Sequence, residues 1–526
     1  LGDVYKRQTL AGGLLTNTNQ HVAFNRMMSR EASIGIDGVY YNPAGVVFMS
    51  EGHHLAINWQ LAFQTRTINN DYALFTNNVN NPITPRDFKG TAFAPVIPSF
   101  QYAYNKGKWS FQASFALTGG GGKCTFDDGL GSFEKIVAET AIAACGLAGV
   151  VDQTLGNTLG QPGMEMFTSD QAFGKTGKYS FNSYMHGRQY YYGLSVGAAY
   201  KFCDNFSAFL GVRGVYALTN YYGYVENINV GNMPLYKVLD PTKESSANIE
   251  LSCDQSGVGF TPIIGVDYKT GRWNFSAKYE FKTRIRLKNK SVNQTPSIGN
   301  LPANLANQMT GILTAKYQQA GLPLEQAKQQ AENTTNAVLN DPTVGATMMG
   351  LKTQFDQKLN KAIGEYEDGK KIAGDIPAYL ALGVGYSPVD AVRVNVGFHW
   401  FDDKNATSYN NRNKELKRGT LEYNAGVEVD VNKKITLSTG WQNTNYGLSD
   451  EYMDDKSFVV SSNSVAIGGV YHINKKMDLN VAYFHTFYQH KKTTETVQLT
   501  ADRSLNYSSD YTRNNNVFAV GLDINF

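Results

Sequence analysis

The chain has 526 residues and a nearly neutral charge, with 48 Lys and Arg against 45 Asp and Glu. This balance argues against a nucleic-acid-binding protein, which normally carries a basic excess. The mean hydropathy is −0.35 and no uncharged apolar run is long enough to span a bilayer as a helix, so a helical membrane protein is excluded. Glycine, with 51 residues, and aromatic residues, with 12%, are unusually frequent for a soluble helical enzyme.

The first residues are expected to lie outside the folded domain. Residues 1–11 predict the remnant of a leader or a scar, because Thr9-Leu10-Ala11 has the small residues of a signal-peptide cleavage site. The apolar core of a signal peptide is missing from this stretch, and the preceding LGDVYKRQ is charged. An ordinary frayed terminus is the alternative interpretation.

Alternation of apolar and polar residues is the main structural signal. In Val392–Trp400 every even position is apolar, and Trp273–Lys282 alternates in the same way. We predict fourteen strands, most of them longer than the ~5–6 residues typical of globular proteins. Their approximate ranges are 52–68, 96–105, 107–118, 188–202, 205–222, 256–270, 272–287, 377–389, 391–403, 417–431, 434–446, 460–473, 476–491 and 510–526.

The connections between these strands alternate in length. Tight turns at positions such as 105–107, 203–205 and 431–433 alternate with long loops. Short turns on one rim and long loops on the other are typical of an outer-membrane barrel, whereas a sandwich has no reason to segregate them. A closed barrel also pairs every backbone group in lipid. We therefore predict an all-β fold, a 14-stranded antiparallel transmembrane β-barrel over residues 49–526, in the outer membrane of a Gram-negative bacterium.

Two long outer loops carry helical sequence. Loop 119–187 contains an apolar stretch at 132–151, and loop 288–376 contains amphipathic stretches at 304–320, 324–339 and 347–366. An apolar helix outside the membrane must pack against other loops or expose an apolar surface. We therefore predict extracellular loops that are partly helical.

A short motif before the first strand suggests a family. Asn42-Pro43-Ala44-Gly45 ends an N-terminal segment just ahead of the fourteen-strand pattern, and the chain ends on Phe526, as bacterial outer-membrane proteins commonly do. Together these features resemble the FadL/TodX family of outer-membrane hydrophobic-compound transporters. The resemblance implies an N-terminal hatch, here residues 12–48, that plugs the barrel. It also implies ligand capture by outer loops and lateral release through a gap at an inward kink of the third strand. The long helical loops here are the second and fourth, whereas those of the family are usually the third and fourth.

The resemblance places the kink near a glycine run. The third strand runs into Gly119 and Gly120, and glycine weakens strand pairing, so the kink and lateral opening are expected at Ala116, Leu117, Gly119 and Gly120. A flexible loop is the alternative for the same residues.

Several cations are expected to face the lumen, because a Lys or Arg facing lipid near the midplane costs about 2–4 kcal/mol. The ligand-contact candidates are Arg213, Lys278, Lys282, Arg284 and Arg393. A cation beside an apolar cavity could hold the carboxylate of a fatty acid. The alternative is a self-contained network, such as Glu280 bridging two lysines of its strand.

No catalytic motif is evident, and no cysteine pair has the CxxC or zinc-ligand spacing, so we expect neither an enzyme, nor a metal, nor a cofactor. Cys124 and Cys145 share the second loop and could form a disulfide. We predict passive transport of hydrophobic small molecules, such as long-chain fatty acids, by a monomer in contact with outer-membrane lipid and lipopolysaccharide. A diffusion porin for polar solutes, and an adhesin or scaffold acting through the outer loops, remain alternatives.

Overall fold

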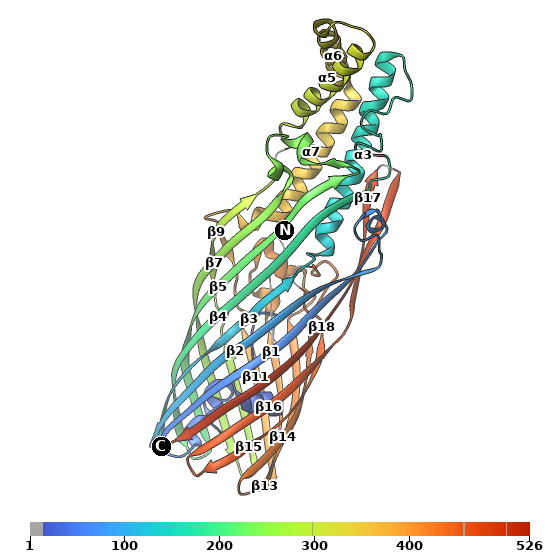
Figure 1. Cartoon of the computed structure of the whole chain (residues 1–526). Helices are drawn as coiled ribbons and strands as arrows, with labels where there is room; N and C mark the ends of the chain where they lie inside the picture. Colours follow the sequence, from blue (N-terminus) through green and yellow to red (C-terminus); the bar gives the residue numbers. More distant parts are fainter. Residues whose placement is uncertain (1–13, 297, 456–457, 501) are drawn as a thin grey trace.

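The computed structural model is a closed antiparallel β-barrel with helices above one rim (Figure 1). The structure describes residues 14–296, 298–455, 458–500 and 502–526. The predicted leader or scar at 1–11 lies outside the described residues. The barrel closes where β1 (Gly52–Tyr72) pairs with β18 (Arg503–Asn525), in register from His54 opposite Asn525 to Tyr72 opposite Tyr507.

In the described residues, the wall crosses from rim to rim fourteen times with antiparallel strands, as predicted; we call each crossing a stave, whether it consists of one strand or of two. Eleven of them are single strands: β1, β18 and those at Arg86–Lys106 (β2), Trp109–Phe126 (β3), Tyr179–Cys203 (β4), Phe206–Val230 (β5), Ile249–Thr270 (β7), Val392–Phe401 (β12), Thr420–Asn432 (β13), Ile435–Asn445 (β14) and Ser462–Asn474 (β15). Three staves are divided, into Trp273–Glu280 and Arg286–Gln294 (β8, β9), Lys371–Ala373 and Tyr379–Val389 (β10, β11), and Met477–Tyr488 and Lys491–Thr500 (β16, β17). The two-residue β6 (Met233–Pro234) only extends the edge of β5.

The outer face of the wall is apolar. Side chains alternate between buried inward positions and exposed outward ones, and the exposed set includes Trp59, Phe63, Leu194, Leu210, Phe260, Ile264, Val396, Leu437, Ile467 and Phe518. A closed sheet with such an outer band satisfies its backbone in lipid, so the wall spans a membrane. β4 and β5 have 25 residues each, longer than predicted, because they continue beyond the ~9–11 residues that cross a bilayer.

Residues 14–48 of the predicted hatch lie inside the barrel, where most of them are buried. This hatch segment contains α1 (Val22–Met27), α2 (Gly38–Tyr41) and the 3-10 turn η1 (Gly45–Phe48). α1 packs against β13 to β16 on one side of the barrel, while η1 packs against β3, β4, β5 and β7 on the other. The segment therefore crosses the lumen from wall to wall.

The helices above the rim form a crown (Figure 1). It consists of α3 (Gly131–Leu159) from the second loop and α5 (Leu301–Gln319), α6 (Leu324–Leu339) and α7 (Pro342–Ile363) from the fourth, so the predicted helical loops are confirmed. The short α4 (Tyr236–Leu239) belongs to the third loop and contacts α5. α3 is long and apolar enough to cross a membrane by composition, but it stands in the crown with half of its most apolar stretch buried.

Candidate functional site

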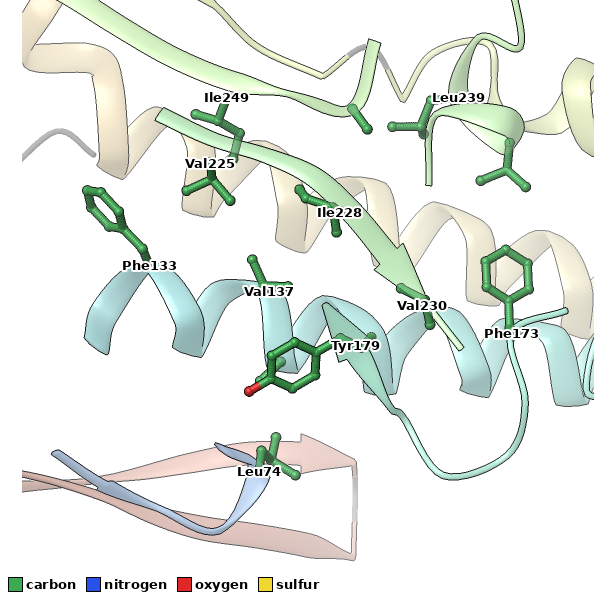
Figure 2. Close-up of a cluster of buried hydrophobic side chains, with 14 of the residues drawn as sticks. Leu74, Phe133, Val137, Phe173, Tyr179, Val225, Ile228, Val230, Leu239 and Ile249 are labelled. Atoms are coloured by element: carbon green, nitrogen blue, oxygen red, sulfur yellow. The ribbon is translucent and has the colours of Figure 1, made fainter. Parts of the chain in front are cut away.

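The apolar face of α3 borders a cavity in the crown. The cavity has a volume of 160 Å³, and apolar side chains of α3, α5, α7, β5, β7 and the second and third loops line most of it. They include Val137, Ala144, Leu147, Phe173, Ile228, Leu239, Ile249, Leu305 and Leu351. Figure 2 shows Val137 of α3 facing Val225 and Ile228 of β5 in the hydrophobic core that borders the cavity.

The size of this cavity suits one aromatic ring. An engineered apolar cavity of about 150 Å³ in another protein stays dry and binds benzene. Polar groups lie at one edge of the crown cavity, where Glu139 accepts a hydrogen bond from Lys358 Nζ at 2.6 Å and lies 3.5 Å from Lys135 Nζ. The crown can therefore hold a small apolar molecule beside a neutralised ion pair.

A second, polar cavity of 660 Å³ adjoins the first and shares Ile136, Glu139 and Lys358 with it. Its floor includes Tyr507 and Tyr511 of β18, on the inner side of the wall. We call this cavity the vestibule. Among the described residues, eight carboxylates line it, against three cations; the carboxylates are Glu139, Glu365, Glu415, Asp450, Glu451, Asp454, Asp455 and Glu495, and the cations are Lys135, Lys358 and Arg412.

The wall is irregular between β2 and β3. Their ladder stops between the pairs Phe93–Lys123 and Ser99–Ala116, so residues 94–98 and 117–122 do not pair with each other. Pro95 and Pro98 have no N–H to donate, which favours such an interruption. On the other edge of β3, two bulges break the register with β4, after Leu117 and after Gly120.

The bend of β3 requires glycine. Gly120 has φ +72°, and a Cβ there would lie 2.3 Å from the carbonyl oxygen of Gln189. At Gly119 a Cβ would lie 2.6 Å from the carbonyl oxygen of Leu15, in the hatch segment. Only a residue without a side chain lets the wall and the hatch segment approach this closely.

The hatch segment also bonds to the interrupted edge. Asn17 donates its backbone N–H to the Thr118 carbonyl at 2.9 Å, and its side-chain amide to the Gly120 carbonyl at 2.6 Å. Sequence reasoning did not single out Asn17, because its partners lie about one hundred positions away. Apolar side chains surround the interruption; they are Met28, Ala62, Ala94, Ile97, Leu117, Tyr190, Tyr192, Phe484 and Val517. Ala116, Leu117, Gly119 and Gly120 thus lie at the irregular edge of β3, and their role as a lateral opening stays a prediction.

The Asn-Pro-Ala-Gly motif ties the hatch segment to the wall near its short-turn rim. Gln112 of β3 donates to the Pro43 carbonyl at 2.7 Å, and Ser207 of β5 donates to the Ala44 carbonyl at 2.7 Å. Asn42 donates to Asp267 of β7 and accepts the Gly45 N–H. A Cβ at position 45 would overlap the Asn42 side chain, so the glycine permits this arrangement.

Three predicted lumen cations are engaged by carboxylates. Arg213 makes two hydrogen bonds to Glu280, at 2.6 and 2.9 Å, and Lys278 lies 3.0 Å from the same carboxylate. Lys278 also donates to the Tyr40 carbonyl, which connects this cluster to the hatch segment. Arg393 bonds to Glu428 and Asp430. This geometry favours the self-contained network, and contact of these cations with a ligand stays a prediction.

The two other predicted cations lie in the divided seventh stave. Lys282 is partly exposed and donates to the Asn405 carbonyl at 3.1 Å. Arg284 is exposed, whereas its neighbours Thr283 and Ile285 are fully buried, so its expected inward orientation is wrong. A one-residue shift in register against β7, between β8 and β9, reverses the alternation of faces beyond Glu280.

The possible disulfide between Cys124 and Cys145 is absent, and both thiols are free. Cys124 lies in β3, whereas Cys145 lies fourteen residues into α3, where its thiol faces the Phe173 carbonyl. Among the described residues, no group of three or more His, Cys, Asp or Glu side chains is placed to hold a metal ion.

The architecture of this barrel matches solved structures. A FadL homologue from Pseudomonas aeruginosa aligns with a TM-score of 0.59 over 98% of this chain and 100% of its own, at 13% identity. The chain has the FadL/TodX-type fold. A deletion mutant of TodX, described as a monoaromatic hydrocarbon channel, aligns with a TM-score of 0.51 at 13% identity, over 96% of this chain and 99% of its own. The toluene transporter TodX of Pseudomonas putida aligns at 0.48, with 13% identity over 98% of this chain and 100% of its own.

Sequence comparison adds nothing to this structural likeness. No family model matches the chain, and no curated protein matches it significantly. The FadL/TodX-type fold is therefore visible in the arrangement of the strands and hatch segment, at an identity too low to transfer individual site residues.

Proposed function

We propose that the protein carries hydrophobic small molecules passively across the bacterial outer membrane. The observation that supports this most is the pairing of an apolar cavity in the crown with an interrupted, apolar-lined stretch of wall, in a barrel whose lumen the hatch segment crosses. A ligand captured between α3, α5 and α7 would pass into the lumen and leave sideways at the unpaired residues of β2 and β3. Because apolar molecules prefer the bilayer to a polar lumen, lateral exit suits such cargo.

The solved structures support the same class of cargo. A structural neighbour that aligns with a TM-score of 0.51 is described as a monoaromatic hydrocarbon channel. The location that goes with this fold is the outer membrane, where lipid and lipopolysaccharide surround the barrel. Transport along such a path needs no enzymatic step and no cofactor.

Filling the crown cavity tests the capture step. Ala144→Trp places an indole among the lining residues and is expected to reduce uptake of toluene about tenfold, because the ligand loses the apolar surface that binds it. The measurement is uptake of radiolabelled toluene by cells that produce the protein, after subtraction of uptake by cells that lack it.

The matched control is Gln153→Trp, on an exposed position of α3 that does not line the cavity. It adds the same side chain to the same helix and should leave uptake unchanged. Equal uptake by the wild type and Ala144→Trp would show that the crown cavity does not lie on the transport pathway. Loss of uptake in both variants would indicate damage to the helix.

A further inference from the structure

The charges around the crown cavity bear on which hydrophobic molecules it admits. In the part of the chain that the structure describes, carboxylates outnumber cations by eight to three in the vestibule, which adjoins the apolar cavity. Two of the cations, Lys135 and Lys358, already form ion pairs with Glu139. A cleft lined by one sign of charge raises the local concentration of opposite charges and lowers that of like charges, by about 10- to 1000-fold in favourable cases.

The excess of carboxylates does not depend on the most buried of them. Asp455 accepts hydrogen bonds from Tyr507 and Tyr511, each at 3.0 Å. Burial raises the pKa of the Asp455 carboxyl, with the neighbouring Asp454 acting in the same direction. Asp450, Glu451 and Glu495 are exposed to solvent. Glu495 pairs with Lys135 and Asp450 pairs with Lys491, and carboxylates still outnumber cations when these pairs and Asp455 are left out.

Three lumen cations are already engaged by carboxylates and do not offset this charge. Arg213 and Lys278 share the carboxylate of Glu280, and Arg393 lies against Glu428 and Asp430. A carboxylate ligand would have to displace these buried partners, at the cost of leaving a charge uncompensated.

We propose that the vestibule makes this protein selective for uncharged molecules of about one aromatic ring and excludes carboxylate anions such as free fatty acids. This inference rests on the proposed function and names the substrate class of the same path. The cavity of 160 Å³ sets the size, and its apolar lining provides the binding. The carboxylates bind nothing themselves; they repel anions before these reach the cavity.

Three ring compounds of similar size test the proposal: toluene, benzoate and benzylammonium. Both ions are penalised on entering an apolar cavity, so their ratio reports the sign of the charge around it. We expect uptake of toluene to be the fastest of the three, and uptake of benzylammonium to exceed that of benzoate about tenfold. High salt should bring that ratio toward one, because about 1 M salt shortens the screening length to ~3 Å.

The triple variant Asp450→Asn, Glu451→Gln, Glu495→Gln removes three exposed carboxylates from the vestibule. It should raise benzoate uptake severalfold and leave toluene uptake unchanged. The matched control is Asp204→Asn, Glu325→Gln, Asp390→Asn, which neutralises three highly exposed acids that do not line it. That control should leave all three rates unchanged.

The outcomes separate this inference from the function on which it rests. If toluene uptake does not depend on the protein, the proposed function fails. If toluene is carried but benzoate and benzylammonium are taken up at equal rates, the charge selection is overturned and the proposed function stands. The same holds if the triple variant leaves the ratio of these two rates unchanged.

Discussion

Gly120 is the residue on which the bend of β3 most depends. Its φ of +72° is strained for a residue with a side chain, and the Gln189 carbonyl occupies the space of a Cβ. Asn17 uses the resulting geometry by bonding to the Gly120 carbonyl. Conformation, close packing and hydrogen bonding therefore coincide at one position in the wall.

Gly120→Ala is expected to destabilise the barrel more than Gly107→Ala does. Gly107 has a similar φ of +59°, but a Cβ there meets nothing within 4 Å. A positive φ alone costs about 1–2 kcal/mol, and forced overpacking adds about 1–3 kcal/mol. Urea unfolding of the detergent-solubilised variants measures the difference in the free energy of unfolding. Equal values for the two variants would show that the Gln189 carbonyl moves aside at no cost.

At the scale of elements, the staves are longer than a bilayer requires, and their irregularities are local. β3 carries two bulges against β4, while β8 and β9 continue one stave across a shift in register against β7. The first irregularity lies where the hatch segment bonds to the wall. The second is bridged to the next stave by two backbone hydrogen bonds between Thr283 and Ile376, both at 3.0 Å. At the first, residues 94–98 of β2 and 117–122 of β3 do not pair with each other.

Deleting Gly119 and Gly120 together is expected to slow uptake of toluene severalfold. The two bulges leave Thr118 and Gly121 of β3 without partners in β4, so removing two residues between them lets β3 pair with β4 in one register, which closes the proposed exit. Uptake by cells measures the effect, and the heat-modifiable mobility of a folded barrel on a gel checks that the variant folds. Unchanged uptake by a folded variant would contradict lateral release at β3.

At the scale of the molecule, the hatch segment joins opposite sides of the wall. Arg26 pairs with Glu428 of β13, while the motif at 42–45 bonds to β3, β5 and β7. Removing one partner of a buried ion pair typically costs about 3–5 kcal/mol, so these anchors hold the segment in place. A barrel whose lumen is obstructed by such a segment is expected to conduct fewer ions than an open porin.

The purified protein is expected to show no large, steady conductance in planar bilayers, because the hatch segment obstructs the lumen. A variant lacking residues 14–48 is the positive control and should conduct ions if its barrel inserts. Large steady conductance by the wild type would favour the diffusion porin.

The sequence by itself determined the class of architecture. Alternation such as that of Val392–Trp400, with short turns alternating with long loops, is a local property that specifies strands, faces and membrane crossing. The apolar stretch at 132–151 likewise predicted a crown helix, and Asn42–Gly45 marked the end of the hatch segment.

Tertiary structure decided which residues meet. The orientation of Arg284 depends on a single extra residue between β8 and β9. The alternation of apolar and polar residues does not reveal such an insertion, so it assigns the wrong face beyond it. The bonds of Asn17 to β3, the partners of Arg213, and the cavity between α3 and α5 join segments distant in the chain. Such contacts depend on strand register and helix placement, which local sequence patterns do not encode. The candidate site is therefore defined by the tertiary structure alone.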